Sequence, residues 1–299
     1  GNDTTACHDN SIKTVIYSSA ISPINNEITA AQARGIPTIP RALMLAELMR
    51  TKYSIAIAGS HGKTTTTSLI SHILLEAAYD PTIIIGGHLK NISTNAQLGN
   101  GDFLVAEADE SDRSLTQLYA AMAVVTNIDF EHVDTYKNID ELKATFLQFL
   151  NNIPFYGFAA VCVDNEHIRS ILPIPHIKVI RYGIENKETD ISAIDISLSA
   201  CKSDFTITLG KDQQEWGRIT LNIPGKHNVL NALAAISVAR ELEVPFTTIA
   251  RALSNFKGIE RRFSFHGNFN NAEIFDDYGH HPEEIKQTLT VAHMRKKNK

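Results

Sequence analysis

Residues 56–67, AIAGSHGKTTTT, constrain the fold of this chain more than any other part of its sequence. An apolar run at 55–58 ends in a glycine, and residues 62–64, Gly-Lys-Thr, open a stretch with the apolar spacing of a helix. A strand, a glycine turn and a helix in this order favour a phosphate-binding loop, because backbone N–H groups at a helix N-terminus attract anions. We therefore predict an α/β fold built around a nucleotide site.

The residue types of this loop each suit a part of polyphosphate binding. Glycines let the backbone approach the phosphates, a lysine adds a full charge and a hydroxyl can bind Mg²⁺; Lys63 and Thr64 are the candidates for the last two roles. The common form G-x-x-x-x-G-K-[ST] would need a glycine where Ile57 stands, which disfavours ordinary kinases and GTPases. The simpler alternative is a helix start with a solvated lysine. The predicted nucleotide-binding residues here are Gly59, Ser60, His61, Gly62, Lys63, Thr64 and Thr65.

Composition excludes several other classes. The chain has 299 residues, 43% hydrophobic and 20% charged, which is ordinary for a globular protein with more than one domain. A net charge of -5 argues against nucleic-acid binding and favours small-molecule partners. Its three cysteines have no C-x-x-C spacing, so we expect neither a disulfide framework nor a zinc site, and a cytoplasmic location fits best. No apolar run approaches the roughly 20 residues that span a bilayer, so we expect no membrane insertion.

The alternation of apolar strands and helices predicts the architecture. Between residues 53 and 163 it is typical of a parallel sheet covered on both faces. After residue 191 apolar residues are spaced by two, which indicates a small antiparallel sheet, and a linker is expected near residues 257–258. The chain begins with Gly1 and ends in a charged tail, so we expect a fragment of a longer protein.

Two further strands end in polar residues that suit a metal site. FLVAEADESD at 103–112 delivers Glu107 at the end of an apolar run, where burial of a carboxylate without a cation would be costly. Asp109, Glu110 and Asp112 follow; a solvated acidic loop suits Asp112 and, less strongly, Glu110.

His132 follows another strand, in VVTNIDFEHVDTY at 124–136, and is either a metal ligand or a structural or surface histidine. The predicted metal ligands are Thr64, Glu107 and His132.

Two motifs in the second half of the chain complete the polar groups. In PGKHNVLNALAA, at 224–235, Asn228 and Asn231 lie on one face of a predicted helix, and an asparagine amide can pair with adenine; a helix cap and a tolerated asparagine are the alternative. The second motif, GIERRFSF followed by IFDDYGHHPEE, has more polar groups than a turn needs. They are Arg261, Arg262, Asp276, Asp277, Tyr278, His280 and His281.

Six strings together resemble the Mur ligase family, because they occur in its order. They are GSHGKTTTT, EADESD, TNIDFEHVDTY, GKHNVLNALAA, RRF and DDYGHHP. The resemblance implies a central P-loop ATPase domain with a mainly parallel sheet and a small antiparallel sheet, flanked by partial Rossmann-like domains. The expected division is 1–50 for the remnant of a UDP-sugar-binding domain, 51–257 for the ATPase domain and 258–299 for the start of a C-terminal ligase domain.

The resemblance also implies roles for individual residues. Lys63 and Thr64 would bind the γ-phosphate and Mg²⁺, and Glu107 and His132 a second Mg²⁺. Asn231 would bind adenine, with Asn228 on the phosphate side. The remaining implied positions are Arg262 with Asp277 at the ribose or phosphates, Tyr278 and His280 at the alanine, and Ser18 and Ser19 at the uridine nucleotide. Asn151 and Asn152 stand where several relatives carry a carbamylated lysine, which is therefore not expected.

The implied activity is ATP-dependent ligation of L-alanine to the carboxylate of UDP-N-acetylmuramate through an acyl phosphate, in peptidoglycan synthesis. Lys63, Glu107, His132, Tyr278 and His280 would be the catalytic residues. Two alternatives stay open. One is the related ligase that recycles murein tripeptide onto the same sugar nucleotide, and the other is a nucleotide-dependent switch protein without ligase activity.

Overall fold

A ten-stranded sheet forms the centre of the molecule in the computed structural model, which describes residues 9–89, 94–270 and 272–297. Cys7 lies outside the described residues. From one edge of the sheet to the other, the strands are β12 (Gln214–Leu221), β11 (Ser203–Leu209), β10 (Ile191–Leu198), β9 (Lys178–Gly183), β8 (Phe158–Cys162), β7 (Met122–Val125), β3 (Tyr53–Ala58), β6 (Phe103–Glu107), β4 (Thr82–Leu89) and β5 (Thr94–Gln97).

The parallel centre of this sheet positions the site. Strand β3 pairs in parallel with β6 and β7, with Ile57 opposite Glu107 and Ala58 opposite Val125. Apart from its first residue, β3 is fully buried, as expected for a strand covered on both faces. Because the three strands run the same way in register, the loops that follow them meet at one edge of the sheet. These are the three loops that carry the predicted phosphate and metal-binding residues.

The predicted antiparallel part is present, and it continues the main sheet. Strands β10, β11 and β12 pair antiparallel, while β10 joins β9 in parallel through Ile191 and Ser192. The predicted fold class, α/β with a mainly parallel sheet plus a small antiparallel part, is therefore confirmed. Two strands of this sheet were not expected from the sequence, β9 and the edge strand β5.

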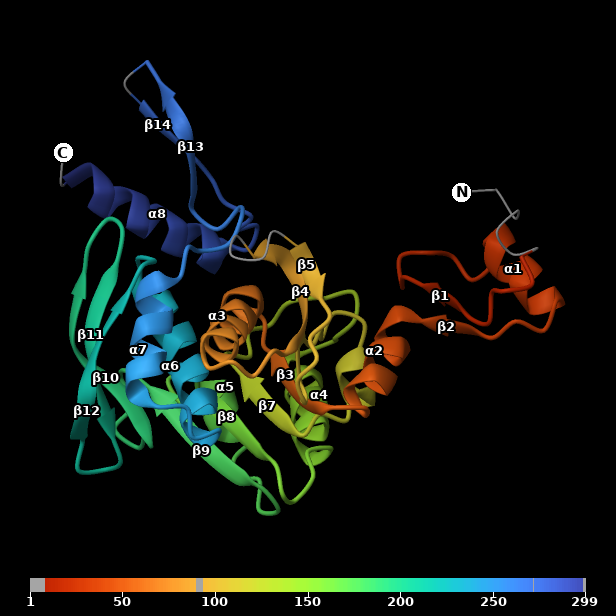
Figure 1. Cartoon of the computed structure of the whole chain (residues 1–299), viewed down its shortest axis with the longest axis horizontal. Coiled ribbons are helices and arrows are strands. Elements are labelled where there is room, and N and C mark those ends of the chain that lie inside the picture. Colours follow the sequence, from red (N-terminus) through yellow and green to blue (C-terminus); the bar gives the residue numbers. More distant parts are fainter. Residues whose placement is uncertain (1–8, 90–93, 271, 298–299) are drawn as a thin grey trace.

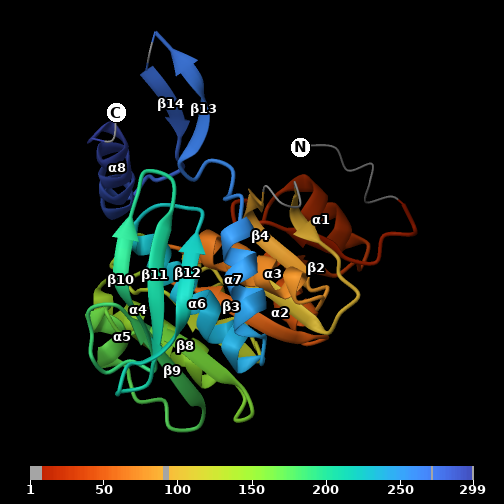
Figure 2. The same cartoon turned by 60° about the vertical axis from the view of Figure 1, so that its left-hand side comes forward.

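Helices cover both faces of the sheet (Figures 1 and 2). Helices α3 (Lys63–Glu76), α6 (Lys226–Glu241) and α7 (Phe246–Asn255) lie together on one face, and α4 (Ile139–Asn151) and α5 (Glu166–Ser170) lie on the other. Residues 65–74 of α3 are all buried, including threonines and serines. Two of these hydroxyls donate back along the helix: Thr67 Oγ1 to the Lys63 carbonyl at 2.8 Å and Ser68 Oγ to the Thr64 carbonyl at 2.7 Å.

Smaller elements lie at both ends of the chain (Figure 1). At the N-terminal end, β1 (Val15–Tyr17) pairs in parallel with β2 (Thr38–Pro40), and helices α1 (Asn26–Ala33) and α2 (Arg41–Met49) complete this part. At the C-terminal end, β13 (Ser264–Phe269) and β14 (Ala272–Asp276) form a hairpin that precedes α8 (Pro282–Lys297). Among the described residues, no helix combines the length and apolarity that crossing a bilayer requires.

Candidate functional site

The predicted phosphate loop joins β3 to α3 and is built around two glycines. Gly59 and Gly62 have φ of +136° and +80°, which only glycine adopts readily. A Cβ on Gly62 would lie 2.5 Å from Asn231 Oδ1, and one on Gly59 would lie 2.1 Å from Thr126 Oγ1. The loop is therefore packed closely against both the end of β7 and helix α6.

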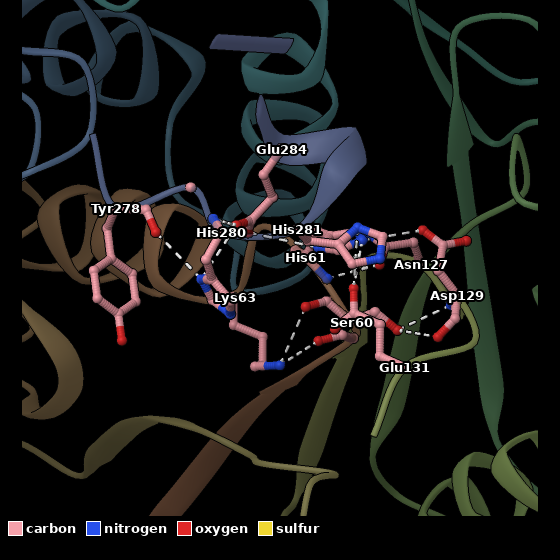
Figure 3. A network of polar contacts seen from close by, with 12 residues as sticks. Ser60, His61, Lys63, Asn127, Asp129, Glu131, Tyr278, His280, His281 and Glu284 are labelled. Atoms are coloured by element: carbon pink, nitrogen blue, oxygen red, sulfur yellow. Dashed lines mark hydrogen bonds and ion pairs between the residues drawn. The ribbon is translucent and has the colours of Figure 1, made fainter. Parts of the chain in front are cut away.

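The segment after β7 holds the loop in place. Asn127 Oδ1 accepts a hydrogen bond from the His61 N–H at 2.8 Å, and Ser60 Oγ donates to the Asp129 carbonyl at 2.9 Å (Figure 3). Asn127 had not been identified from the sequence, although it stands in the TNIDFEH string. These bonds fix the path of the loop backbone, which is the part that would contact phosphates.

Lys63 forms an ion pair with Glu110 at the base of the loop. Its Nζ lies 2.8 and 3.0 Å from the two Glu110 carboxylate oxygens and also donates to the Gly59 carbonyl at 2.6 Å. The expectation of a solvated Glu110 was wrong, because this residue is fully buried. The segment after β6 passes next to the phosphate loop, where Lys63 and His132 compensate the buried negative charge of Glu110. Burial raises the pKa of Glu110, but hydrogen bonds from these two residues outweigh it and hold the pKa below its usual value.

The structure divides the predicted metal ligands into two groups. Glu107 ends β6, accepts a hydrogen bond from the Gly86 N–H at 2.9 Å and is hydrogen-bonded to Thr64. Burial raises the pKa of Glu107, so its carboxylate gains from a nearby cation. His132 Nε2 instead lies 3.3 Å from Glu110, which with Asp109 forms its local group.

The predicted adenine residue Asn231 and its neighbour Asn228 lie beside the phosphate loop, at a cavity of about 460 Å³. Asn231 is almost completely buried; its Oδ1 accepts from Thr66 Oγ1 at 3.3 Å, and its Nδ2 donates to Asn228 Oδ1 at 3.3 Å. Both asparagines line the cavity together with His61, Gly62 and Thr65. The structure therefore brings these two predicted groups together, although they are far apart in the sequence.

Arg262 and Asp277 line the same cavity from the C-terminal side. Arg262 lies 3.7 Å from Glu284, whereas Asp277 organises the local turn by accepting hydrogen bonds from the Phe263 and Gly279 N–H groups, each at 2.8 Å.

Of the other predicted residues near this part of the chain, Tyr278 and His280 do not line the cavity; both are exposed, with ring centroids 5.4 Å apart. Ser18 and Ser19 come directly after β1, which is a strand of the small N-terminal sheet.

Around His61 lies a cluster of charged groups that the sequence had not indicated (Figure 3). Its Nε2 lies 2.9 Å from Glu131, its Nδ1 lies 3.5 Å from Glu284, and its ring centroid lies 4.6 Å from that of His281. Burial lowers the pKa of His61, but the Glu131 and Glu284 carboxylates beside its two ring nitrogens outweigh it and raise the pKa to about 9. In the sequence, Glu131 is marked only by its position next to His132, and Glu284 only by its position inside GHHPEE.

Comparison with known proteins assigns the family. Residues 57–239 match the model of the Mur ligase middle domain, and residues 1–53 match the Mur ligase family catalytic domain. Curated proteins named UDP-N-acetylmuramate–L-alanine ligase are 50% identical over 280 residues in Desulforapulum autotrophicum and 51% identical over 278 residues in Geobacter sp. strain M21. These matches cover 94% and 93% of this chain but 61% and 60% of the relatives, so the chain spans about three fifths of their length.

Solved structures agree with this assignment. The UDP-N-acetylmuramate–alanine ligase of Thermotoga maritima superposes with a TM-score of 0.83 at 26% identity, covering 97% of this chain and 66% of that one. A murein peptide ligase from Psychrobacter arcticus has a TM-score of 0.77 at 27% identity, covering 94% of this chain and 63% of that one. The model of the Mur ligase middle domain matches more than half of this chain, so the chain belongs to the Mur ligase family.

Proposed function

We propose that the protein carrying this chain is an ATP-dependent ligase that joins L-alanine to the carboxylate of UDP-N-acetylmuramate in peptidoglycan synthesis. The observation that carries the proposal is the placement of Lys63, at the base of a phosphate loop, beside a cavity lined by Asn231 and Arg262. About 50% identity to curated relatives named for this activity supports the choice of substrates.

In the proposed reaction, the muramate carboxylate attacks the γ-phosphorus of ATP, giving an acyl phosphate and ADP. The L-alanine amine then attacks the acyl carbon, and phosphate leaves from the tetrahedral intermediate. Phosphoryl transfer depends mainly on positioning and on neutralising charge. Lys63 would supply a positive charge at the γ-phosphate, and the backbone N–H groups of the loop at the start of α3 would orient the phosphates.

The oxygen atoms of Thr64 and Glu107 suit Mg²⁺, which prefers oxygen ligands, and the buried Glu107 carboxylate gains from a cation. Mg²⁺ would supply charge neutralisation at the phosphates. His132 is proposed as a ligand of a second Mg²⁺ with Glu107; in this role it would give up its contact with Glu110.

The remaining roles are proposed along the cavity and around it. Asn231 would bind adenine and Asn228 the phosphate side, with Arg262 and Asp277 at the ribose or phosphates. Tyr278 and His280 would hold the alanine, and Ser18 and Ser19 would contact the uridine nucleotide. We also propose that residues 1–50, 51–257 and 258–299 belong to three domains, for the sugar nucleotide, for ATP and for the amino acid respectively.

The decisive experiment measures ADP release by the whole protein that carries this chain, with each substrate omitted in turn. We expect release to require both UDP-N-acetylmuramate and L-alanine, with UDP-N-acetylmuramoyl-L-alanine as the product identified by mass spectrometry. The similarity to a murein peptide ligase makes murein tripeptide the second acceptor to test. Faster turnover with the tripeptide would assign the recycling reaction, and ATP hydrolysis that ignores both acceptors would refute ligase activity.

A further inference from the structure

Three segments that are distant in the sequence bring two imidazoles and a carboxylate to one point (Figure 3). His61 lies in the phosphate loop, Glu131 in the segment after β7, and His281 directly before α8. One ligand atom from each of the three lies within 4.8 Å of the other two. In the described part of the chain, the other group of this kind is Asp109, Glu110 and His132, beside the residues proposed for Mg²⁺.

Both rings direct a nitrogen at the same carboxylate oxygen. His61 Nε2 lies 2.9 Å and His281 Nδ1 lies 3.4 Å from Glu131 Oε1, and Asp129 Oδ2 lies 3.4 Å from the same His61 nitrogen. His61 Nε2 and Glu131 Oε1 are both buried, and they face each other in an ion pair that does not have the geometry of a hydrogen bond. Buried polar atoms normally have a hydrogen-bond partner. A cation that accepts an electron pair from each of these two atoms would satisfy both of them.

The other nitrogen of His61 is held in the way that is usual for a metal ligand. Its Nδ1 lies 3.5 Å from Glu284 Oε1, and Glu284 is itself held by Arg262 at 3.7 Å and by the His280 N–H at 3.3 Å. Metal-bound histidines generally donate their second N–H to a carboxylate, which fixes the tautomer and the ring orientation. Here that carboxylate comes from α8, so the ring of His61 is oriented by the segment that also brings His281.

We propose that His61, Glu131 and His281 form a binding site for a divalent transition-metal ion of the Zn²⁺ type, distinct from the proposed Mg²⁺ site. Two imidazole nitrogens with carboxylate oxygens favour such an ion over Mg²⁺, whose ligands are mainly oxygen atoms. Asp129 is the fourth candidate ligand. A bound ion would fasten the start of α8 to the phosphate loop and would thereby hold the C-terminal wall of the cavity in place.

The test is direct binding of Zn²⁺ to the 299-residue chain, measured by equilibrium dialysis with elemental analysis, and does not depend on ligase activity. We expect His281→Ala and Glu131→Gln to weaken binding at one site at least about tenfold, and Glu284→Gln to weaken it about tenfold through the orientation of His61. The matched control is His293→Ala, which removes an exposed histidine from the same helix and should leave the affinity unchanged. Circular dichroism of each variant verifies that it is folded.

Two further variants locate the ion. His132→Ala and Cys201→Ser remove the other candidate ligands, a histidine in the second group and an exposed thiol, and both should retain the site. With Co²⁺ as a probe, the visible spectrum of the bound ion should disappear in His281→Ala and persist in His132→Ala. The proposal would be overturned if Zn²⁺ binding were not saturable, or if His281→Ala bound Zn²⁺ as tightly as the wild type does. His61, Glu131 and His281 would then form only a cluster of ion pairs.

Discussion

The Glu110 carboxylate lies 2.8 Å from Lys63 Nζ and is fully buried, so the cation of the phosphate loop has an anionic partner without any nucleotide. Removing one partner of a buried pair leaves the other charge uncompensated. We predict that Glu110→Gln lowers the free energy of unfolding by about 3 to 5 kcal/mol, measured by urea titration. The control is Glu185→Gln, which breaks an exposed pair with Lys226 and should cost no more than about 1 kcal/mol. Equal losses in the two variants would contradict the importance of burial.

Replacement of Lys63 tests the proposed chemistry. In the whole protein that carries this chain, Lys63→Ala should reduce ATP-dependent acyl phosphate formation by at least about 100-fold, because it removes the lysine charge proposed to act at the γ-phosphate. Trapping the acyl phosphate by borohydride reduction measures this step without the second one. Lys211→Ala, an exposed lysine in the turn before β12, should behave as the wild type. Turnover of Lys63→Ala at the wild-type rate would refute the assignment.

Gly62 and Gly210 form a matched pair for the close packing of the loop. Both have positive φ, +80° and +68°, but a Cβ on Gly62 would lie 2.5 Å from Asn231 Oδ1, whereas nothing lies within 4 Å of one on Gly210. Gly210→Ala should therefore cost only the strain of the backbone, about 1 kcal/mol. Gly62→Ala should cost more and should also weaken ATP binding, measured by competition with a fluorescent nucleotide. Similar losses of stability in both variants would show that Asn231 gives way easily.

Asp277 should act chiefly through the turn that it organises. Its two oxygens accept from the Phe263 and Gly279 N–H groups, so Asp277→Ala removes both acceptors. We predict faster hydrogen–deuterium exchange at these two amides, together with weaker ATP binding. Asp276→Ala is the control, because the neighbouring carboxylate contacts Arg261 at 3.4 Å and His266 at 3.9 Å in ion pairs at the surface. Unchanged exchange at Phe263 in Asp277→Ala would rule out the structural role.

His72 predicts a pH dependence of stability away from the site. Burial lowers its pKa from the ordinary value of 6.5, and its ring packs 5.7 Å from that of Phe256. Below pH 6.5 the unfolded chain binds a proton that folded His72 resists, so stability falls as the pH drops from 6.5 towards the lowered folded pKa.

The variant His72→Gln cannot take up this proton. Its free energy of unfolding should therefore change less than that of the wild type between pH 7 and pH 5, measured by urea titration. Parallel curves for the two proteins would show that His72 does not titrate differently in the folded state.

The elements with strong local patterns could be predicted from the sequence. The apolar run of β3 and the glycine turn before α3 specify a buried parallel strand and a loop, and the spacing by two specifies β10 to β12. Strand β5, TNAQ, carries no apolar pattern and is a strand because it pairs with the edge of β4. Strand β9 begins with a lysine and has an arginine near its centre. These charged residues interrupt the apolar pattern by which a partly buried strand is recognised.

The candidate site shows the same division between local and distant information. Lys63 could be singled out because it follows a glycine turn at the start of a helix pattern, and Glu107 because it ends an apolar strand pattern. Glu110 was not, because its burial depends on Lys63 and His132 reaching it from other segments. Glu284 likewise has no local pattern; it belongs to the site only because α8 places it beside His61.

The side chain of Asn231 joins helix α6 to the phosphate loop and to the first turn of α3. Thr66 and Asn231 are 165 residues apart, yet their side chains are hydrogen-bonded, and Asn231 leaves no room for a side chain on Gly62. Helix α6 also packs on β8, β9 and β10, so the loop, the helix and this part of the sheet form one packed unit. A nucleotide bound at the proposed site would therefore meet a loop and a helix that are already packed against each other, and little rearrangement between them would be needed.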